Sequence, residues 1–165
     1  MAMTGKVLVM IVSAVAMPEP PAWHLEYEVR NAGDKPVWLV VDENLVFRHE
    51  DSRIELSFAR GQMQPGVQVF GYFNPAVEEL PPGESLRRAV EIPWPSPLSD
   101  IWNAGREATP SPGDYEVKLR VGFGMSEAPD AAAVGESVEA PVLRWQHTAV
   151  SAPVSLAVPP YQRSR

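Results

Sequence analysis

The chain of 165 residues contains no cysteine. No disulfide can therefore stabilise it, and no thiolate can act as a nucleophile or a metal ligand. The absence of disulfides favours a reducing compartment, so we expect a cytoplasmic protein. Basic residues are also scarce: 14 Lys and Arg stand against 21 Asp and Glu, the net charge is −7, and the longest basic cluster is the pair Arg87-Arg88. Such a chain repels a phosphate backbone, so nucleic acid is not an expected partner.

Long hydrophobic runs are missing as well. The apolar run near the N-terminus, Val7–Val12, is far shorter than the roughly 20 residues that a membrane-spanning helix requires, so no membrane span is expected. Lys6, this run and the small residues Ala14–Ala16 have the order of a signal peptide. Residues 1–16 would then be a leader and the protein periplasmic or secreted. We favour a strand, because the segment is unusually short for a leader and has a single basic residue.

Catalytic and metal-binding motifs are absent from the sequence. There is no G-x-S-x-G elbow, no Ser-x-x-Lys motif and no H-E-x-x-H helix, and the three histidines, His24, His49 and His147, are scattered singly. Four acidic residues bracket one predicted hairpin, namely Asp42, Glu43, Glu50 and Asp51. Without a calcium-loop pattern, they are interpreted as solvated turn carboxylates. We therefore expect a protein that is not an enzyme, with no catalytic residue, no metal site and no cofactor.

Alternation of apolar and polar residues is what the sequence does contain. Between Trp23 and Val29 every second residue is apolar, and the same period recurs between Tyr115 and Phe123. This period predicts strands that bury one face. Leu86–Ile92 alternates too, but Arg88 stands on its apolar face, which predicts a strand near the edge of a sheet.

These segments, with 18 Pro and 11 Gly between them, predict seven to nine short strands and little helix. Short strands bury their apolar faces against one another, so the predicted fold is all-β, an antiparallel β-sandwich, with a closed barrel as the rival. We expect a single domain over residues 1–160 and a frayed tail over residues 161–165.

Three segments resemble the immunoglobulin/fibronectin-type sandwich of many bacterial proteins: Leu25–Val37, Leu80–Leu86 and Pro112–Val121. The resemblance implies an immunoglobulin-like fold and a bacterial protein. It also implies that Trp38 is a core tryptophan and Tyr115 a tyrosine corner, whose hydroxyl bonds backbone upstream of its strand. With the alternation pattern, the expected core then includes the following residues: Tyr27, Trp38, Tyr115 and Leu119.

The order of these motifs is also similar to that of the bacterial intracellular proteinase inhibitor family, another small β-sandwich. An Asn-containing turn with Pro, a PGES turn and a late PG-x-Y-x-V strand follow one another in the same order. The stretch after Val41 departs from the family, because it lacks the aromatic-Asp pair and the Gly-x-x-Val-Trp strand. The resemblance implies a proteinase inhibitor that presents an exposed loop.

The long connection Pro93–Gly113 contains an amphipathic group of residues that proline partly pre-orders: Trp94, Pro95, Pro97, Ile101 and Trp102. Aromatic side chains of this kind are typical of binding hot spots, so this is the candidate partner-binding loop. The alternative, favoured by the rarity of exposed apolar patches, is that both rings cover an open end of the sandwich. The expected function is a non-catalytic module that binds another protein. The alternatives are the inhibitor and, if residues 1–16 are a leader, an exported carbohydrate- or surface-binding sandwich.

Overall fold

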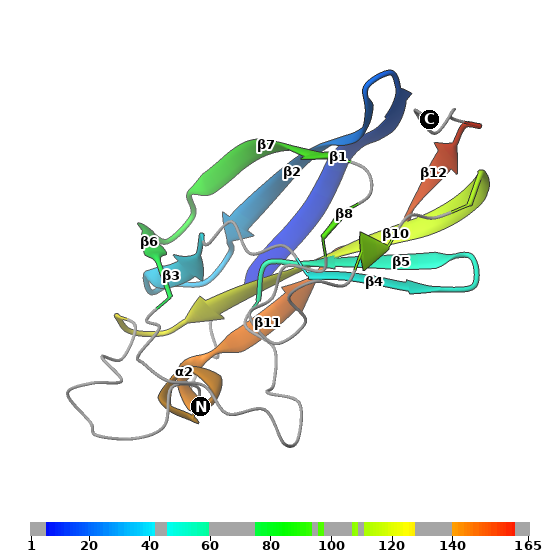
Figure 1. The fold of residues 1–165 in the computed structure, drawn as a ribbon. Coiled ribbons are helices and arrows are strands. Elements are labelled where there is room, and N and C mark those ends of the chain that lie inside the picture. Colours follow the sequence, from blue (N-terminus) through cyan, green and yellow to red (C-terminus); the bar gives the residue numbers. More distant parts are fainter. Residues whose placement is uncertain are drawn as a thin grey trace.

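The computed structural model describes residues 6–41, 46–59, 75–93, 96–97, 107–108, 111–127 and 140–160. Two β-sheets face each other across one hydrophobic core, so the predicted all-β sandwich is confirmed. Figure 1 shows strands β1, β2 and β7 side by side in one layer, with β4, β5, β10, β11 and β12 in the other.

The smaller sheet has three antiparallel strands in the order β1-β2-β7. They are β1 (Val7–Pro18), β2 (Pro21–Asn31) and β7 (Ser85–Pro93). The apolar run near the N-terminus thus forms a strand, with Val7 and Ile11 in the core. Its ladder with β2 is interrupted by a register shift between Ile11 and Ser13, which is the signature of a β-bulge. The partly polar strand β7 lies at the end of this sheet.

The larger sheet has seven strands and is built around β10 (Gly113–Gly124). Its other strands are β3 (Val37–Val40), β4 (Val46–Glu50), β5 (Arg53–Ser57), β6 (Val77–Leu80), β11 (His147–Val150) and β12 (Val154–Val158). The sequence predicted antiparallel pairing throughout, but β5 and β10 run parallel. The described residues contain twelve strands rather than seven to nine. Two of them, β8 (Ser96–Pro97) and β9 (Glu107–Ala108), are only two residues long.

The final strand is broken, as the proline at position 153 predicts. Both pieces, β11 and β12, pair with β10 on either side of the break. The segment before β11 is the short helix α2 (Ala140–Trp145). The Trp145 indole donates a hydrogen bond to the Ser126 carbonyl at 2.8 Å, and its ring lies against Gly124 so closely that a Cβ there would be 1.9 Å away. The missing side chain at Gly124 therefore leaves the space that this ring occupies.

Of the expected core residues, Leu119 is completely buried and Tyr115 nearly so. The Tyr115 hydroxyl donates to the Ser111 carbonyl at 2.6 Å, four residues upstream. Tyr27 is half-buried and packs against the core. The expectation that Trp38 is a core residue is wrong, because its side chain is partly exposed. Its neighbours Val37 and Leu39 are buried, so the alternation of a strand directs the Trp38 side chain to the opposite face of β3. The tryptophan of the core is Trp23, which is 2% exposed.

One buried polar residue joins the two sheets at a corner. Asn31, at the end of β2, has no exposed surface, and its side-chain Nδ2 donates to the carbonyls of Lys35 (2.7 Å) and Leu80 (3.0 Å). Its backbone bonds the turn between β6 and β7, where Gly83 has a φ of 79°. A Pro followed by a residue of positive φ is typical of a type II turn, which explains the Pro-Gly sequence here.

A candidate binding site at the outer edge of strand β7

The loop residues that the sequence singled out do not form a described site. Trp94, Pro95, Ile101 and Trp102 lie outside the described residues, and Pro97 is described only as part of the backbone of β8. The role of this loop therefore stays a prediction. The described residues show a different candidate, along β7.

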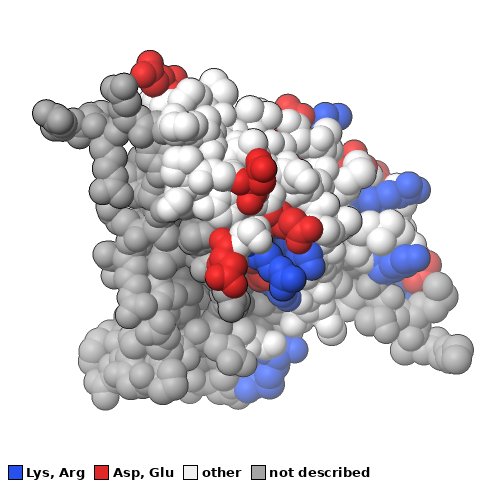
Figure 2. Space-filling view, turned by 90° about the vertical axis from the view of Figure 1, so that its right-hand side faces the viewer, with Lys and Arg blue, Asp and Glu red and all other residues white. Residues whose placement is uncertain are grey.

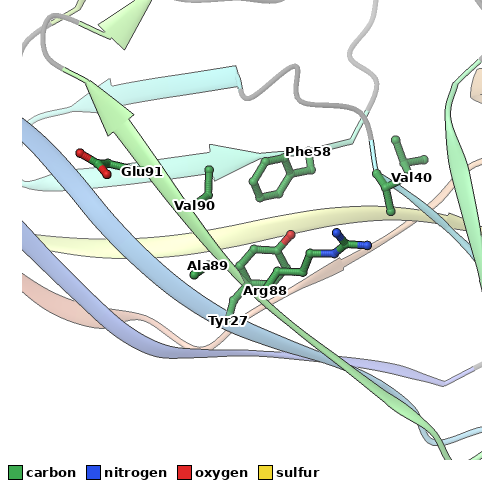
Figure 3. Close-up of a pocket in the computed structure, with 8 residues that line it drawn as sticks. Tyr27, Val40, Phe58, Arg88, Ala89, Val90 and Glu91 are labelled. Atoms are coloured by element: carbon green, nitrogen blue, oxygen red, sulfur yellow. The ribbon is translucent and has the colours of Figure 1, made fainter.

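A pocket of about 410 Å³ opens between the two sheets beside β7 (Figure 3). Tyr27 of β2 and Phe58, which directly follows β5, provide its aromatic walls, and Val40 and Val41 at the end of β3 line one side. Residues 88–91 of β7 complete the lining. A pocket of this volume lies in the range that accommodates small ligands or a large side chain.

The aromatic walls are held by the core and by the backbone of both sheets. Tyr27 lies on the inward face of β2, and its ring stacks on that of Phe58 with centroids 5.5 Å apart and an angle of 29° between the planes. The Phe58 amide donates to the Arg120 carbonyl at 2.9 Å, and the Val41 amide donates to the Ala76 carbonyl at the same distance. These backbone bonds fix the two chain segments on either side of the pocket.

The edge of β7 forms the mouth of the pocket. Successive side chains of a strand point to opposite faces, so a cavity on one face touches every second residue. Four consecutive residues, 88–91, line this pocket. The lining therefore includes parts of β7 that face away from the core, at an edge that pairs with no other described strand, and a ligand there would meet the β7 backbone as well as its side chains.

The mouth of the pocket carries two opposite charges. Arg88 lies beside Tyr27 in the ladder of β2 and β7, and Figure 3 shows its side chain running from β7 towards Val40. Its guanidinium forms an ion pair with Glu78 of β6, and both side chains are 45% exposed. Glu91 lies three residues along the same strand. The Cα atoms of Arg88 and Glu91 are thus about 10 Å apart along the strand, and their side chains leave it on opposite faces.

The Tyr27 hydroxyl is the polar group inside the pocket. Burial raises the pKa of Tyr27 above its ordinary value, and the positive charge of Arg88 offsets part of this rise. The phenol is therefore protonated at neutral pH and is able to donate or accept a hydrogen bond. Its hydroxyl points towards the side of the pocket where Arg88 and Val40 lie (Figure 3).

The described residues contain no group of three or more His, Asp or Glu side chains arranged to hold a metal ion. None of their helices has the length and apolar composition of a membrane span. On the face shown in Figure 2, acidic and basic side chains lie beside one another rather than in separate areas. The features of the pocket that a ligand would meet are its shape, its aromatic walls and the charges of Arg88 and Glu91.

No protein-family model matches this chain, and neither curated proteins nor solved structures include a match to it. The role of the site is therefore argued from its geometry alone. Sequence analysis found two of its elements, the inward position of Tyr27 and the edge position of β7. It did not find Phe58 or Val41, because strands far apart in the chain bring them to the same place.

Proposed function

We propose that the protein is a non-catalytic binding module that receives an extended segment of another protein along the outer edge of β7. The observation that supports this proposal is the position of the pocket, whose mouth is the free edge of that strand. Among the described strands, only β2 pairs with β7. An extended peptide would continue the sheet through main-chain hydrogen bonds and insert one side chain into the pocket.

The lining predicts which peptide the edge prefers. The stacked rings of Tyr27 and Phe58 favour a large apolar or aromatic side chain. Arg88 and Glu91 favour an acidic residue near one end of that side chain and a basic residue near the other, which also sets the direction of the peptide. The exposed ion pair of Arg88 with Glu78 is worth at most about 1 kcal/mol, so an acidic ligand can displace Glu78 at little cost.

Selection from a random peptide library on the intact chain tests this proposal. We expect selected peptides to carry an apolar residue flanked by opposite charges, and Arg88→Glu to weaken their binding at least tenfold. The matched control is Arg87→Glu, because Arg87 lies on the opposite face and pairs with Glu26 of β2 at 3.1 Å, outside the pocket. Binding that both variants weaken equally, or that neither changes, would contradict a site at this edge.

A further inference from the structure

The largest hydrophobic side chains on the surface gather on one strand. Six large hydrophobic residues among the described ones are exposed, and five of them belong to β1. They are Leu8 (47% exposed), Met10 (55%), Val12 (39%), Val15 (48%) and Met17 (47%). We call these five residues the β1 stripe. A stripe of this kind on a surface strand marks an interaction site rather than ordinary scatter.

The strand that carries the stripe is itself an open edge. Among the described strands only β2 pairs with β1, so the other edge of β1 presents free backbone groups. Natural proteins protect such edges with charged residues, with proline or with bulges. The twelve residues of β1 include no charged residue, and their one proline is the last residue. Apart from its bulge, the strand itself therefore carries none of these protective features within its length.

The bulge gives the β1 stripe an internal symmetry. Before it, Leu8 and Met10 lie opposite Arg30 and Glu28 of β2, and after it Val15 lies opposite His24. These three β2 residues share one face, so the even-numbered residues before the bulge and the odd-numbered residues after it point the same way. Four of the five stripe residues, Leu8, Met10, Val15 and Met17, are thus arranged symmetrically about a point between residues 12 and 13, and Val12 has Ser13 as its counterpart.

We propose that two copies of this chain pair edge to edge through β1, antiparallel, about a two-fold axis between residues 12 and 13. This register places Leu8 opposite Met17 of the second copy and Met10 opposite Val15 of the second copy. In a regular strand, a two-fold axis between adjacent residues would set residues of opposite faces against each other. The bulge removes this conflict, and the three-stranded sheets of the two copies join into one sheet of six strands.

Charge and area set the strength of this pairing. No charged residue of β1 opposes its counterpart across the axis, but each chain carries a net charge of −7, which repels the other copy at long range. Twelve residues give an edge about 40 Å long in a layer about 10 Å thick, or about 800 Å² over both copies. An interface of this size is typical of weak association, so we expect a Kd on the order of 10 to 100 µM that falls as salt screens the charges.

Sedimentation velocity of the intact chain over a concentration series tests the pairing. We expect a monomer to give way to a dimer as the concentration rises through the expected Kd, with a stronger dimer at higher salt. Met10→Lys should weaken the dimer at least tenfold, because it puts a charge opposite Val15 of the second copy. The matched control is Ser85→Lys, which adds the same charge at an exposed position two strands away from β1. A wild-type chain that stays monomeric throughout would overturn the proposal, whether or not the peptide site on β7 exists.

A second variant tests the register itself. Met10→Lys combined with Val15→Glu in one chain places opposite charges across the axis at two equivalent points, so we expect the dimer to return to within about threefold of the wild type. Circular dichroism of each variant checks that the fold is kept, since both positions are exposed in the single chain. A double variant that remains monomeric while the wild type dimerises would overturn this register.

Discussion

The two edges of the three-stranded sheet differ in their charged and apolar side chains. The β1 edge has no charged residue in twelve positions and exposes a stripe of large apolar side chains. The β7 edge carries Arg87, Arg88 and Glu91, and its two arginines form ion pairs with Glu26 and Glu78. We propose that charge and a pocket suit the β7 edge to a chemically distinct ligand, whereas the β1 edge suits a second copy of itself. The two outer edges of one sheet therefore suit two different kinds of partner.

The two edges also differ in how they are attached. The start of β7 is joined to the corner residue Asn31 through the turn at Gly83, with backbone bonds of 2.8 and 3.0 Å. In β1, the backbone bond from the Ala32 amide to the Lys6 carbonyl closes the same end of the sheet. Asn31 also binds the carbonyls of Lys35 and Leu80, so its side chain holds the β7 side of the corner more than the β1 side.

Asn31→Ala should have the largest effect on the comparison between the edges. It removes the bonds of the buried Asn31 side chain to the Lys35 and Leu80 carbonyls and to the Gly33 amide, one of them buried and two partly buried, and each lost bond costs on the order of 1 kcal/mol. We expect the free energy of unfolding to fall by about 3 kcal/mol. Hydrogen exchange should accelerate more in the first residues of β7 than in β1. Equal acceleration in both strands would mean that the corner does not favour one edge.

Asn31→Asp sharpens this test. The carboxylate keeps an acceptor for the Gly33 amide at 3.0 Å, but it replaces the Nδ2 donor by an oxygen that faces two carbonyls. An unpaired charge in a fully buried position is costly, so we expect this variant to be less stable than Asn31→Ala. The reverse order in denaturant unfolding would show that the bond to Gly33 matters most.

Strand positions were predictable from the sequence where one face of the strand is buried and the other is exposed to solvent. The alternation from Trp23 to Val29 and from Tyr115 to Phe123 corresponds to β2 and β10, and the partly polar face of β7 indicated an edge. The parallel pairing of β5 with β10 was not predictable, because a period of two residues says nothing about direction. Trp38 was misplaced for a related reason. In a run of apolar residues, the pattern does not show which face turns inward.

The binding pocket shows the same limit more sharply. Its walls come from β2, from the end of β3, from the residue after β5 and from β7, four segments that are separate in the chain. Each apolar residue there is ordinary in its own strand. Only the long-range pairing of the strands brings Tyr27 and Phe58 into contact. The β1 stripe is different, since its residues all belong to one strand, but its symmetry depends on the bulge, which the apolar run at residues 7–12 did not reveal.

The pH dependence of the free energy of unfolding above about pH 10 tests Tyr27, which lines the pocket beside β7 and does not belong to the β1 edge. Burial raises the pKa of Tyr27 above about 10, so in this range the folded state holds its proton more tightly than the unfolded state does. The stability due to the neutral phenol is complete below pH 10 and is lost as the pH rises through the folded-state pKa. In urea unfolding, we expect Tyr27→Phe to lose less stability than the wild type as the pH rises above about 10. Parallel pH profiles would contradict a buried phenol.

Glu78→Gln should have the smallest effect and separates binding from stability at the β7 edge. The ion pair with Arg88 is exposed, and such pairs contribute about 0.2 to 1 kcal/mol, so the free energy of unfolding should change by less than about 1 kcal/mol. Without Glu78 the Arg88 guanidinium no longer has to exchange partners, and peptides with an acidic residue should bind more tightly by up to about threefold. Dimerisation through β1 should stay unchanged, because the two edges lie on opposite sides of β2. A change in the dimer without a change in peptide binding would show that the two edges do not act independently.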